Sequence, residues 1–337
     1  RVELGAFKEG NGGYLHKIKD HQPSGNIPPV TRKPRKQKSG AETLDAVYRA
    51  FLYELVLSPE HLAQLKSNKR QMSDAQITRR MYRTLPGTGR AKVCRILSQQ
   101  FTQSELLSVP GFYISNKGRY GEYLTFAGTE GLLCPFRDKE DRIVGLQIRP
   151  DDSSGSKYTW FSCGQNHKEG VGIGGEKGLP AHVSIPFEQR DSRVFVTEGP
   201  IKADIASDIL GAVVIAVPGI HSWKACRLLE TVRDLEANEV VIAYDSEDNE
   251  PTRREERKVA TALQIAGNTV YLAKWNGEKG KGIDDLLLGG GRPTFDRWEY
   301  RSSGDAKRRT ERKRVIEIPA LAVPKTKDVE PFSIDHI

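Results

Sequence analysis

Acidic residues follow three apolar runs in the second half of the chain, and their side chains could hold a metal ion. Unpaired carboxylates that lie close together repel one another, so a positive charge must lie among them if the fold brings them together. Carboxylate oxygens with no cluster of His or Cys nearby favour Mg²⁺ or Mn²⁺. The six candidate ligands are Glu198; Asp245, Glu247 and Asp248; and Asp284 and Asp285.

These acids can meet only if the apolar runs are neighbouring strands of one sheet. Between residues 193 and 288, runs typical of buried strands alternate with helical patterns, such as Ile201, Ile205 and Ile209 at four-residue spacing ahead of Gly211. The alternation predicts right-handed βαβ crossovers and an α/β fold with a mostly parallel sheet of four strands. Functional groups collect beyond the carboxyl ends of such strands, so we expect the three acidic groups at one edge.

Each acid taken alone also has a structural explanation. A carboxylate that follows a strand often caps the next helix, and Asp284 could cap the helix "DLLL". A structural explanation does not predict that three acidic groups converge on one edge of one sheet. We therefore favour the metal site.

The rest of the chain changes in composition several times. Helical signals begin near Leu44, where Ser58 precedes Pro59 and where Ser73 and Gln76 have the spacing of a capping box. Short β-branched and aromatic runs bounded by Gly, Asp and Pro come next. The expected segments are a basic flexible tail (1–41), a helical lead-in (42–110), a β-rich subdomain (111–190), the metal-binding domain (191–290) and a basic carboxy-terminal tail (291–337).

The overall composition narrows the class of protein. A net charge of +8 and a pI near 9.2 favour a polyanionic partner. No apolar run is long enough to span a bilayer, and no secretion signal opens the sequence, so no membrane partner is expected. The 4 cysteines are scattered without metal-binding spacing and read as free thiols of a reduced, cytoplasmic protein.

Two sets of motifs carry a resemblance to a known family. Glu198-Gly199 after an apolar strand, with an Asp-x-Asp-like group after a later strand, resembles the Toprim domain of DnaG-type primases, topoisomerases, recombination proteins and some nucleases. The preceding segment, 132–162, resembles the amino-terminal half of the DnaG-type primase catalytic core. The residues that match its motifs are Pro135, Arg137, Asp138, Gly145, Arg149, Lys157 and Tyr158.

The resemblance covers about residues 42 to 290, and "TEGPIKAD" and "KGIDDLL" are most similar to primase-like proteins of plasmids, phages and integrative elements. It implies a Rossmann-like Toprim domain of four mostly parallel strands flanked by helices, preceded by a small mixed α+β subdomain and a helical lead-in. It also implies a DNA primase that joins nucleoside triphosphates on a single-stranded DNA template with Mg²⁺ or Mn²⁺, with a replicative helicase as a possible partner.

The resemblance assigns roles to individual residues. Catalysis falls to Glu198, Asp245 and Glu247, and nucleotide binding to Gly199 and Lys202. Four residues would bind single-stranded DNA: Arg137, Arg149, Lys157 and Tyr158. The three cations would contact phosphates, and the ring of Tyr158 would stack on bases.

The chain departs from the family pattern at two places. It has Asp245-Ser246-Glu247-Asp248 where primases have Asp-x-Asp, so either Glu247 or Asp248 takes the second ligand position. It has Pro-Ile-Lys after Glu198-Gly199 where Tyr-Met-Asp is common, which leaves Lys202 near the site. Two alternatives therefore stay open: a Toprim nuclease, and a catalytically degenerate Toprim protein that binds nucleic acid or a nucleotide.

Overall fold

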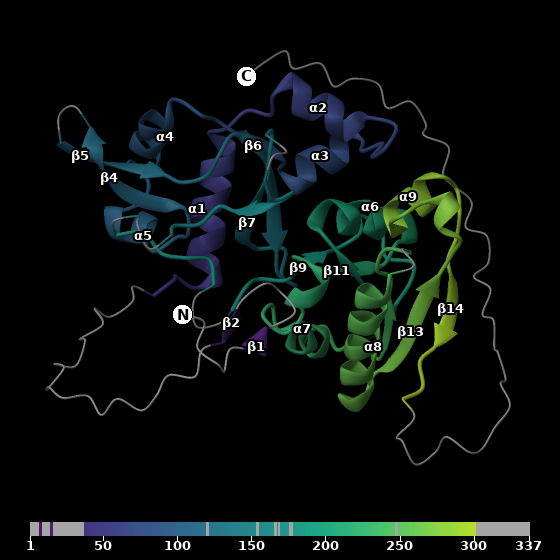
Figure 1. Cartoon of the computed structure of the whole chain (residues 1–337). Helices are drawn as coiled ribbons and strands as arrows, with labels where there is room; N and C mark the ends of the chain where they lie inside the picture. The colour runs from purple at the N-terminus through teal and green to yellow at the C-terminus, as the bar shows by residue number, and fades with distance from the viewer. Residues whose placement is uncertain are drawn as a thin grey trace, which may run out of the picture. The chain divides into compact units, whose positions relative to one another are not determined.

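The computed structural model describes residues 37–118, 121–152, 155–164, 167, 169–174, 178–246 and 249–300, together with two short strands near the amino terminus. The chain divides into two units, Arg1–Arg35 and Lys36–Ile337. In the first unit, β1 (Phe7–Lys8) pairs antiparallel with β2 (Tyr14–Leu15). The second unit is shown with its labelled elements in Figure 1. Most of both predicted tails, and both Glu247 and Asp248, lie outside the described residues.

The second unit begins with short helices. They are α1 (Ala41–Tyr53), α2 (Pro59–Lys66), α3 (Asp74–Arg80), α4 (Arg90–Leu97) and α5 (Gln103–Leu107). Their starts follow the sequence: the Ser58 hydroxyl accepts from the amide of His61, and Ser73 and Gln76 form a capping box. Helix α1 buries Phe51 among the rings of Phe112, Phe126 and Phe161.

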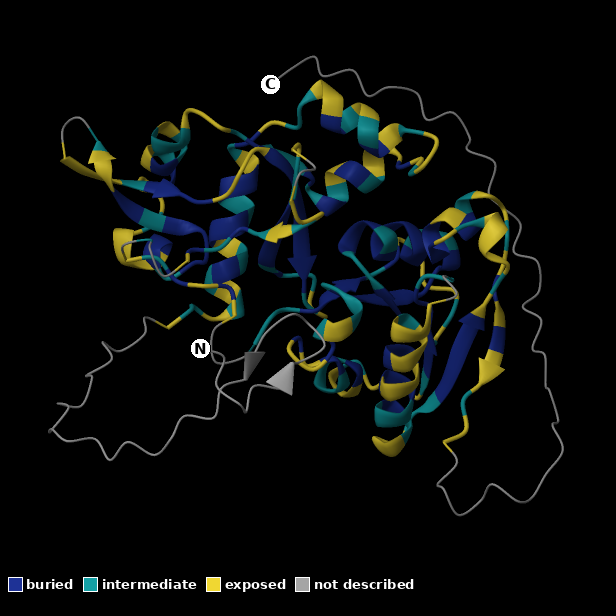
Figure 2. Cartoon of the chain, viewed as in Figure 1, coloured by how far each residue is buried: buried dark blue, intermediate teal, exposed yellow. Residues whose placement is uncertain are grey.

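An antiparallel sheet lies beside these helices. Its strand order is β3-β6-β7-β8, with β3 (Arg83–Leu85), β6 (Gly131–Arg137), β7 (Ile143–Pro150) and β8 (Thr159–Trp160). A separate hairpin joins β4 (Phe112–Gly118) to β5 (Gly121–Phe126). The segment that resembles the primase core forms the β6–β7 hairpin, and every residue of β6 is buried. Figure 2 shows this burial at the centre of the sheet.

A second sheet holds the predicted parallel strands. The order is β14-β13-β12-β10-β11-β9, from β9 (His182–Ser184), β10 (Val194–Glu198), β11 (Val213–Val217), β12 (Glu239–Ile242), β13 (Thr269–Lys274) and β14 (Thr294–Arg297). The inner four strands are parallel, which confirms the α/β prediction, whereas β9 and β14 pair antiparallel at the two edges. The sheet thus extends past the predicted boundaries at 191 and 290.

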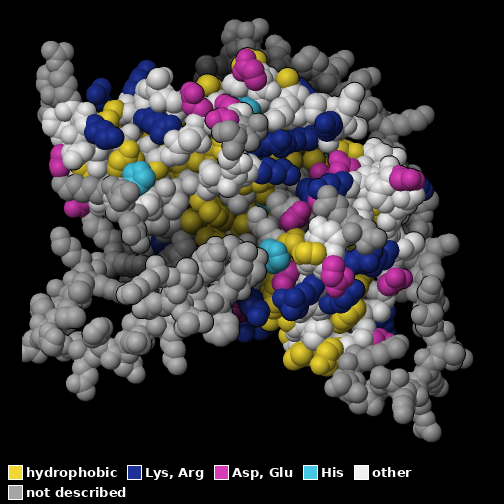
Figure 3. Space-filling view, viewed as in Figure 1, with side chains coloured by type: hydrophobic (Ala, Val, Ile, Leu, Met, Phe, Trp, Pro, Cys, Tyr) yellow, Lys and Arg dark blue, Asp and Glu magenta, His cyan; other side chains and the backbone are white. Residues whose placement is uncertain are grey.

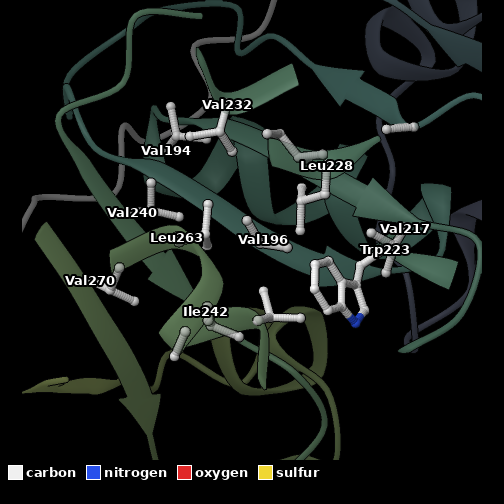
Figure 4. Packing of buried hydrophobic residues seen from close by; sticks show 14 of the residues in the cluster. Val194, Val196, Val217, Trp223, Leu228, Val232, Val240, Ile242, Leu263 and Val270 are labelled. Carbon is white, nitrogen blue, oxygen red and sulfur yellow. The ribbon is translucent and has the colours of Figure 1, made fainter. Parts of the chain in front are cut away.

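Helices cover both faces of the six-stranded sheet. They are α6 (Pro200–Leu210), α7 (Leu228–Asp234), α8 (Glu250–Ile265) and α9 (Ile283–Leu288), with 3₁₀ turns at Ile220–Ser222 and Gly277–Lys279. On one face, Val196 and Ile242 pack against Val232 of α7 and Leu263 of α8 (Figure 4). On the other face, Phe195 packs with Ala203 of α6 and Leu286 of α9. Alternate strand residues thus face opposite layers, as the unbroken apolar runs predict.

Helix α6 also contacts the antiparallel sheet. Its residues Ile201 and Ile205 share a core with Tyr82, Leu132 and Cys134. One helix therefore packs on both sheets, and it begins at the residue that follows Glu198 and Gly199. Within the described ranges, none of the helices has both the length and the apolar composition needed to cross a bilayer.

Candidate active site

Three carboxylates form what we call the acidic edge: Glu198, Asp245 and Asp284. They lie near the ends of two parallel strands and at the start of one helix. Glu198 is the last residue of β10, Asp245 follows β12, and Asp284 lies in the first turn of α9. Gly199, at φ 81°, turns the chain from β10 into α6, a conformation that side chains with a Cβ disfavour. The amide of Gly199 donates to the carbonyl of Val217 at 3.0 Å, so this glycine makes the turn and its N–H is already used.

A lysine lies among these carboxylates. The Lys202 ammonium donates to Asp245 Oδ1 and lies 3.6 Å from Glu198 Oε1. The side chain of Lys202 is 17% exposed and that of Asp245 is 9% exposed, so water screens this ion pair only partly. Lys281 is 3.9 Å from Asp245 Oδ2 but is largely exposed. Lys202 therefore supplies the positive charge that a group of carboxylates requires.

The two neighbouring aspartates of α9 face different surroundings. Asp284 is buried, and its Oδ1 atom has no hydrogen-bond partner. Asp285 is exposed, and its Oδ2 atom accepts from the amide of Gly282 at 3.2 Å, so it caps its own helix. The fold thus brings Asp284 to the acidic edge, whereas the capping role considered for Asp284 belongs to Asp285.

Burial changes the acidity of two of these groups. Burial raises the pKa of Glu198, and the Asp245 carboxylate raises it further, while the charges of Lys202 and Lys157 lower it. Burial also raises the pKa of Asp284 to about 6. Perturbed carboxylates of this kind, held in one cluster, are typical of functional sites.

The donor set has the chemistry for a hard divalent cation. Glu198, Asp245 and Asp284 offer oxygen atoms alone, and the Oδ1 atom of Asp284 is buried without a partner. In the part of the chain that the structure describes, no three acidic, histidine or cysteine side chains lie together closely enough to hold a metal ion. An ion at this edge would therefore require the ammonium of Lys202 to move from Asp245.

Lys157, one of the predicted DNA-binding cations, lies near this edge. Arg149 and Lys157 line a cavity of about 690 Å³ together with residues of α2, among them Glu60 and His61. The influence of Lys157 on the pKa of Glu198 places its charge close to the acids. Figure 3 shows basic side chains gathered beside acidic ones in the middle of one face.

Tyr158 is less available than a stacking platform needs to be. Its ring packs against the core shared by α2, α3 and α6, and burial raises the pKa of its hydroxyl. The Lys157 ammonium lies 5.9 Å from the ring centroid. One face of this ring is therefore taken by the protein.

Arg137 does not fit the predicted role in DNA binding. Its side chain is 1% exposed, and its guanidinium donates to the backbone carbonyls of Asp141 at 2.9 Å and of Arg79 at 3.1 Å. A phosphate cannot reach a buried guanidinium whose donors are already used. This burial follows from the position of Arg137 at the end of β6, a strand whose two faces are both covered.

A buried polar network next to the site has no counterpart among the sequence predictions. The carboxylate of Asp204 on α6 accepts from Tyr82 at 2.5 Å and from Ser184 at 2.8 Å, and it lies 3.1 Å from His182 and 3.2 Å from Arg80. Burial alone would raise the pKa of Asp204, but Arg80 and His182 hold it well below its usual range. The sequence held one signal of this network: Asp204 is an acid next to Ile205, on the apolar stripe of helix α6.

Gly282 makes room for the site, which gives a testable consequence. A Cβ atom at this position would lie 2.3 Å from Asp284 Oδ1 and 3.2 Å from Lys202 Nζ. We expect Gly282→Ala to displace the carboxylate of Asp284, the closer of the two, and to weaken binding of Mn²⁺ about tenfold, measured by calorimetric titration. The control is Gly40→Ala, where nothing lies within 4 Å. Equal affinities in both variants would contradict this packing.

Solved structures with a similar fold are primases. The zinc-binding and RNA polymerase domains of Aquifex aeolicus primase match with a TM-score of 0.53 and 14% identity over 74% of this chain and 59% of that one. The RNA polymerase domain of Mycobacterium tuberculosis DnaG matches with a TM-score of 0.51 and 18% identity over 74% of this chain and 82% of that one. The chain has the fold of a primase catalytic core.

This fold confirms the coarse part of the resemblance. The chain spans about 59% of the length of the Aquifex structure. A family model described as a domain of unknown function, DUF3854, matches residues 186–293, which contain the acidic edge. No curated protein sequence matches the chain.

Proposed function

We propose that this protein is a primase-like nucleotidyltransferase that joins nucleotides on a single-stranded DNA template at the acidic edge. The observation that carries the proposal is the convergence of Glu198, Asp245 and Asp284 on one cation, near Lys157 and the cavity that it lines with Arg149, in a primase-core fold. Acids that hold an ion beside basic residues that hold phosphates suit transfer of a nucleotidyl group.

The residues divide between two tasks. Glu198, Asp245 and Asp284 would hold Mg²⁺ or Mn²⁺, with Glu247 and Asp248 as further ligands; the bound ions would neutralise the triphosphate and acidify the primer hydroxyl. Arg149 and Lys157 would position the template. Replication of a mobile genetic element and a replicative helicase as partner both stay predictions.

One assay tests this function. The full chain is incubated with Mg²⁺ or Mn²⁺, single-stranded DNA and labelled nucleoside triphosphates, and the products are separated by length. Lengthening labelled products support nucleotidyl transfer, and shortened DNA with no labelled product would instead identify a nuclease.

A second candidate is a protein that binds nucleic acid without catalysis. The contact of Lys202 with Asp245 favours it, because an ammonium already neutralises the edge. Binding of single-stranded DNA together with no product from the assay, in either metal, would select this candidate over both enzymes.

Template binding should depend on Arg149 and Lys157. We expect Arg149→Ala and Lys157→Ala each to weaken binding of single-stranded DNA and to lower the slope of log affinity against log salt by about 0.7, the value for one lost phosphate contact. The measurement is fluorescence anisotropy at several salt concentrations. The matched control is Arg233→Ala, which removes a 75% exposed cation on α7. If Arg233→Ala lowers the slope as much as the other two variants do, the effect reflects general charge attraction and no specific contact by Arg149 or Lys157.

A further inference from the structure

Lys202 occupies an unfavourable place for a cation. It is the third residue of α6, where the amide dipoles of the helix present positive charge, and a cation there loses stability. Its side chain is only 17% exposed, so it has also lost most of its hydration. Strong compensation must therefore come from its neighbours.

The compensation comes from carboxylates on three sides. Asp245 Oδ1 accepts from the ammonium, and Glu198 Oε1 lies 3.6 Å from it. Asp284 adds a favourable electrostatic interaction, and its unpaired Oδ1 atom and the Lys202 ammonium approach the same side of Gly282. Lys202 Nζ thus lies against carboxylate oxygens of Asp245 and Glu198 that a metal ion would bind.

We propose, on the basis of the function proposed above, that Lys202 is a built-in counter-ion that competes with the divalent metal for the carboxylate of Asp245. In the metal-free protein the ammonium holds the acidic edge together. A divalent ion can bind Asp245 only after Lys202 has left, because two cations within a few ångströms repel each other strongly. Lys202 therefore sets the metal concentration at which the site loads.

The side chain is suited to such an exchange. A lysine ammonium sits on a flexible four-carbon stem and makes a point-charge contact, so it can leave one carboxylate without any change in the backbone. An arginine would hold the same carboxylate through two parallel hydrogen bonds and would leave less readily. This difference gives two variants with different expected effects.

The test is the affinity of the full chain for Mn²⁺ alone, measured by electron paramagnetic resonance of free Mn²⁺ without nucleotide or DNA. We expect Lys202→Met, which keeps the length and removes the charge, to bind Mn²⁺ at least about tenfold more tightly than the unmodified chain. We expect Lys202→Arg to bind it no more tightly than the unmodified chain. The control is Lys281→Met, which removes an exposed lysine 3.9 Å from the same carboxylate and should change the affinity less than about threefold.

Metal-free stability is the second measurement. Without Lys202 the carboxylates repel, so Lys202→Met should melt at a lower temperature in chelator and recover when Mn²⁺ is added. Unchanged or weaker Mn²⁺ affinity in a folded Lys202→Met chain would overturn the proposal, as would loss of folding that Mn²⁺ does not correct.

These outcomes are independent of catalysis. If the unmodified chain makes primers but Lys202→Met gains no affinity for Mn²⁺, this inference fails and the proposed function stands. If no product forms but Lys202→Met gains affinity, the proposed function fails and the counter-ion role stands.

Discussion

Asp245→Asn is expected to reduce primer synthesis about 1,000-fold while the protein remains folded. The amide keeps the shape of the side chain but removes the negative charge that faces Lys202 and would face a metal ion. Charge stabilisation by a bound metal is worth several kcal/mol, and about 4 kcal/mol corresponds to this loss of rate. Folding should persist because Glu198 and Asp284 remain as counter-charges for Lys202, and because the substitution also reduces the repulsion among the acids.

The measurement is the rate of labelled product formation, with circular dichroism as the check on folding. The matched control is Asp296→Asn, which makes the same change at an exposed position of β14 and should leave the rate unaltered. If Asp245→Asn retained full synthesis, neither this carboxylate nor the acidic edge could have the proposed role in the reaction.

Asp204→Asn is expected to destabilise the protein by about 3–5 kcal/mol, the usual cost of removing one partner from a buried ion pair. Asp204 is fully buried, and its loss removes one of the two carboxylates that pair with Arg80, which is 1% exposed and keeps Asp208 at 3.1 Å. The measurement is the midpoint of urea unfolding. For comparison, Glu250→Gln breaks an exposed pair with Arg257 and should cost less than about 1 kcal/mol.

A double variant separates the pair from its surroundings. Arg80→Met should also destabilise the protein, and the double variant should cost clearly less than the sum of the two single changes, since one residue's loss removes the other's stranded charge. Additive effects would show that the two side chains act independently.

The lowered pKa of Asp204 also makes its contribution to the free energy of unfolding depend on pH. That contribution is complete above the unfolded pKa near 4 and is lost as the pH falls further.

The sequence patterns were sufficient to predict the layers of the fold and the sheet edge at which the three acids meet. Unbroken apolar runs such as the one ending at Glu198 predict strands covered on both faces, and the helical spacing from Ile201 to Ile209 predicts what covers them. Because parallel strands share an edge, the meeting of Glu198, Asp245 and Asp284 followed from the order of elements alone.

Orientation of individual side chains could not be predicted in the same way. Asp284 and Asp285 are adjacent, and only the 100° turn per residue of α9 and the packing of that helix decide that one faces the acids and the other caps the helix. Arg137 ends a strand that is buried on both faces, which depends on contacts with a distant part of the chain. Tertiary packing, rather than local sequence, determines such cases.

The two antiparallel edge strands, β9 and β14, determine where a separate domain could be excised from this chain. The DUF3854 match spans residues 186–293, so it begins just after β9, which ends at Ser184, and stops just before β14, which starts at Thr294. A fragment cut at those limits would leave β11 and β13 as edge strands with one open side, both rich in apolar residues, and would uncover the ring of Phe195 that Phe295 contacts. Open apolar edges are templates for pairing between molecules. An excised domain that keeps residues 181–300 should accordingly precipitate less readily than the shorter piece.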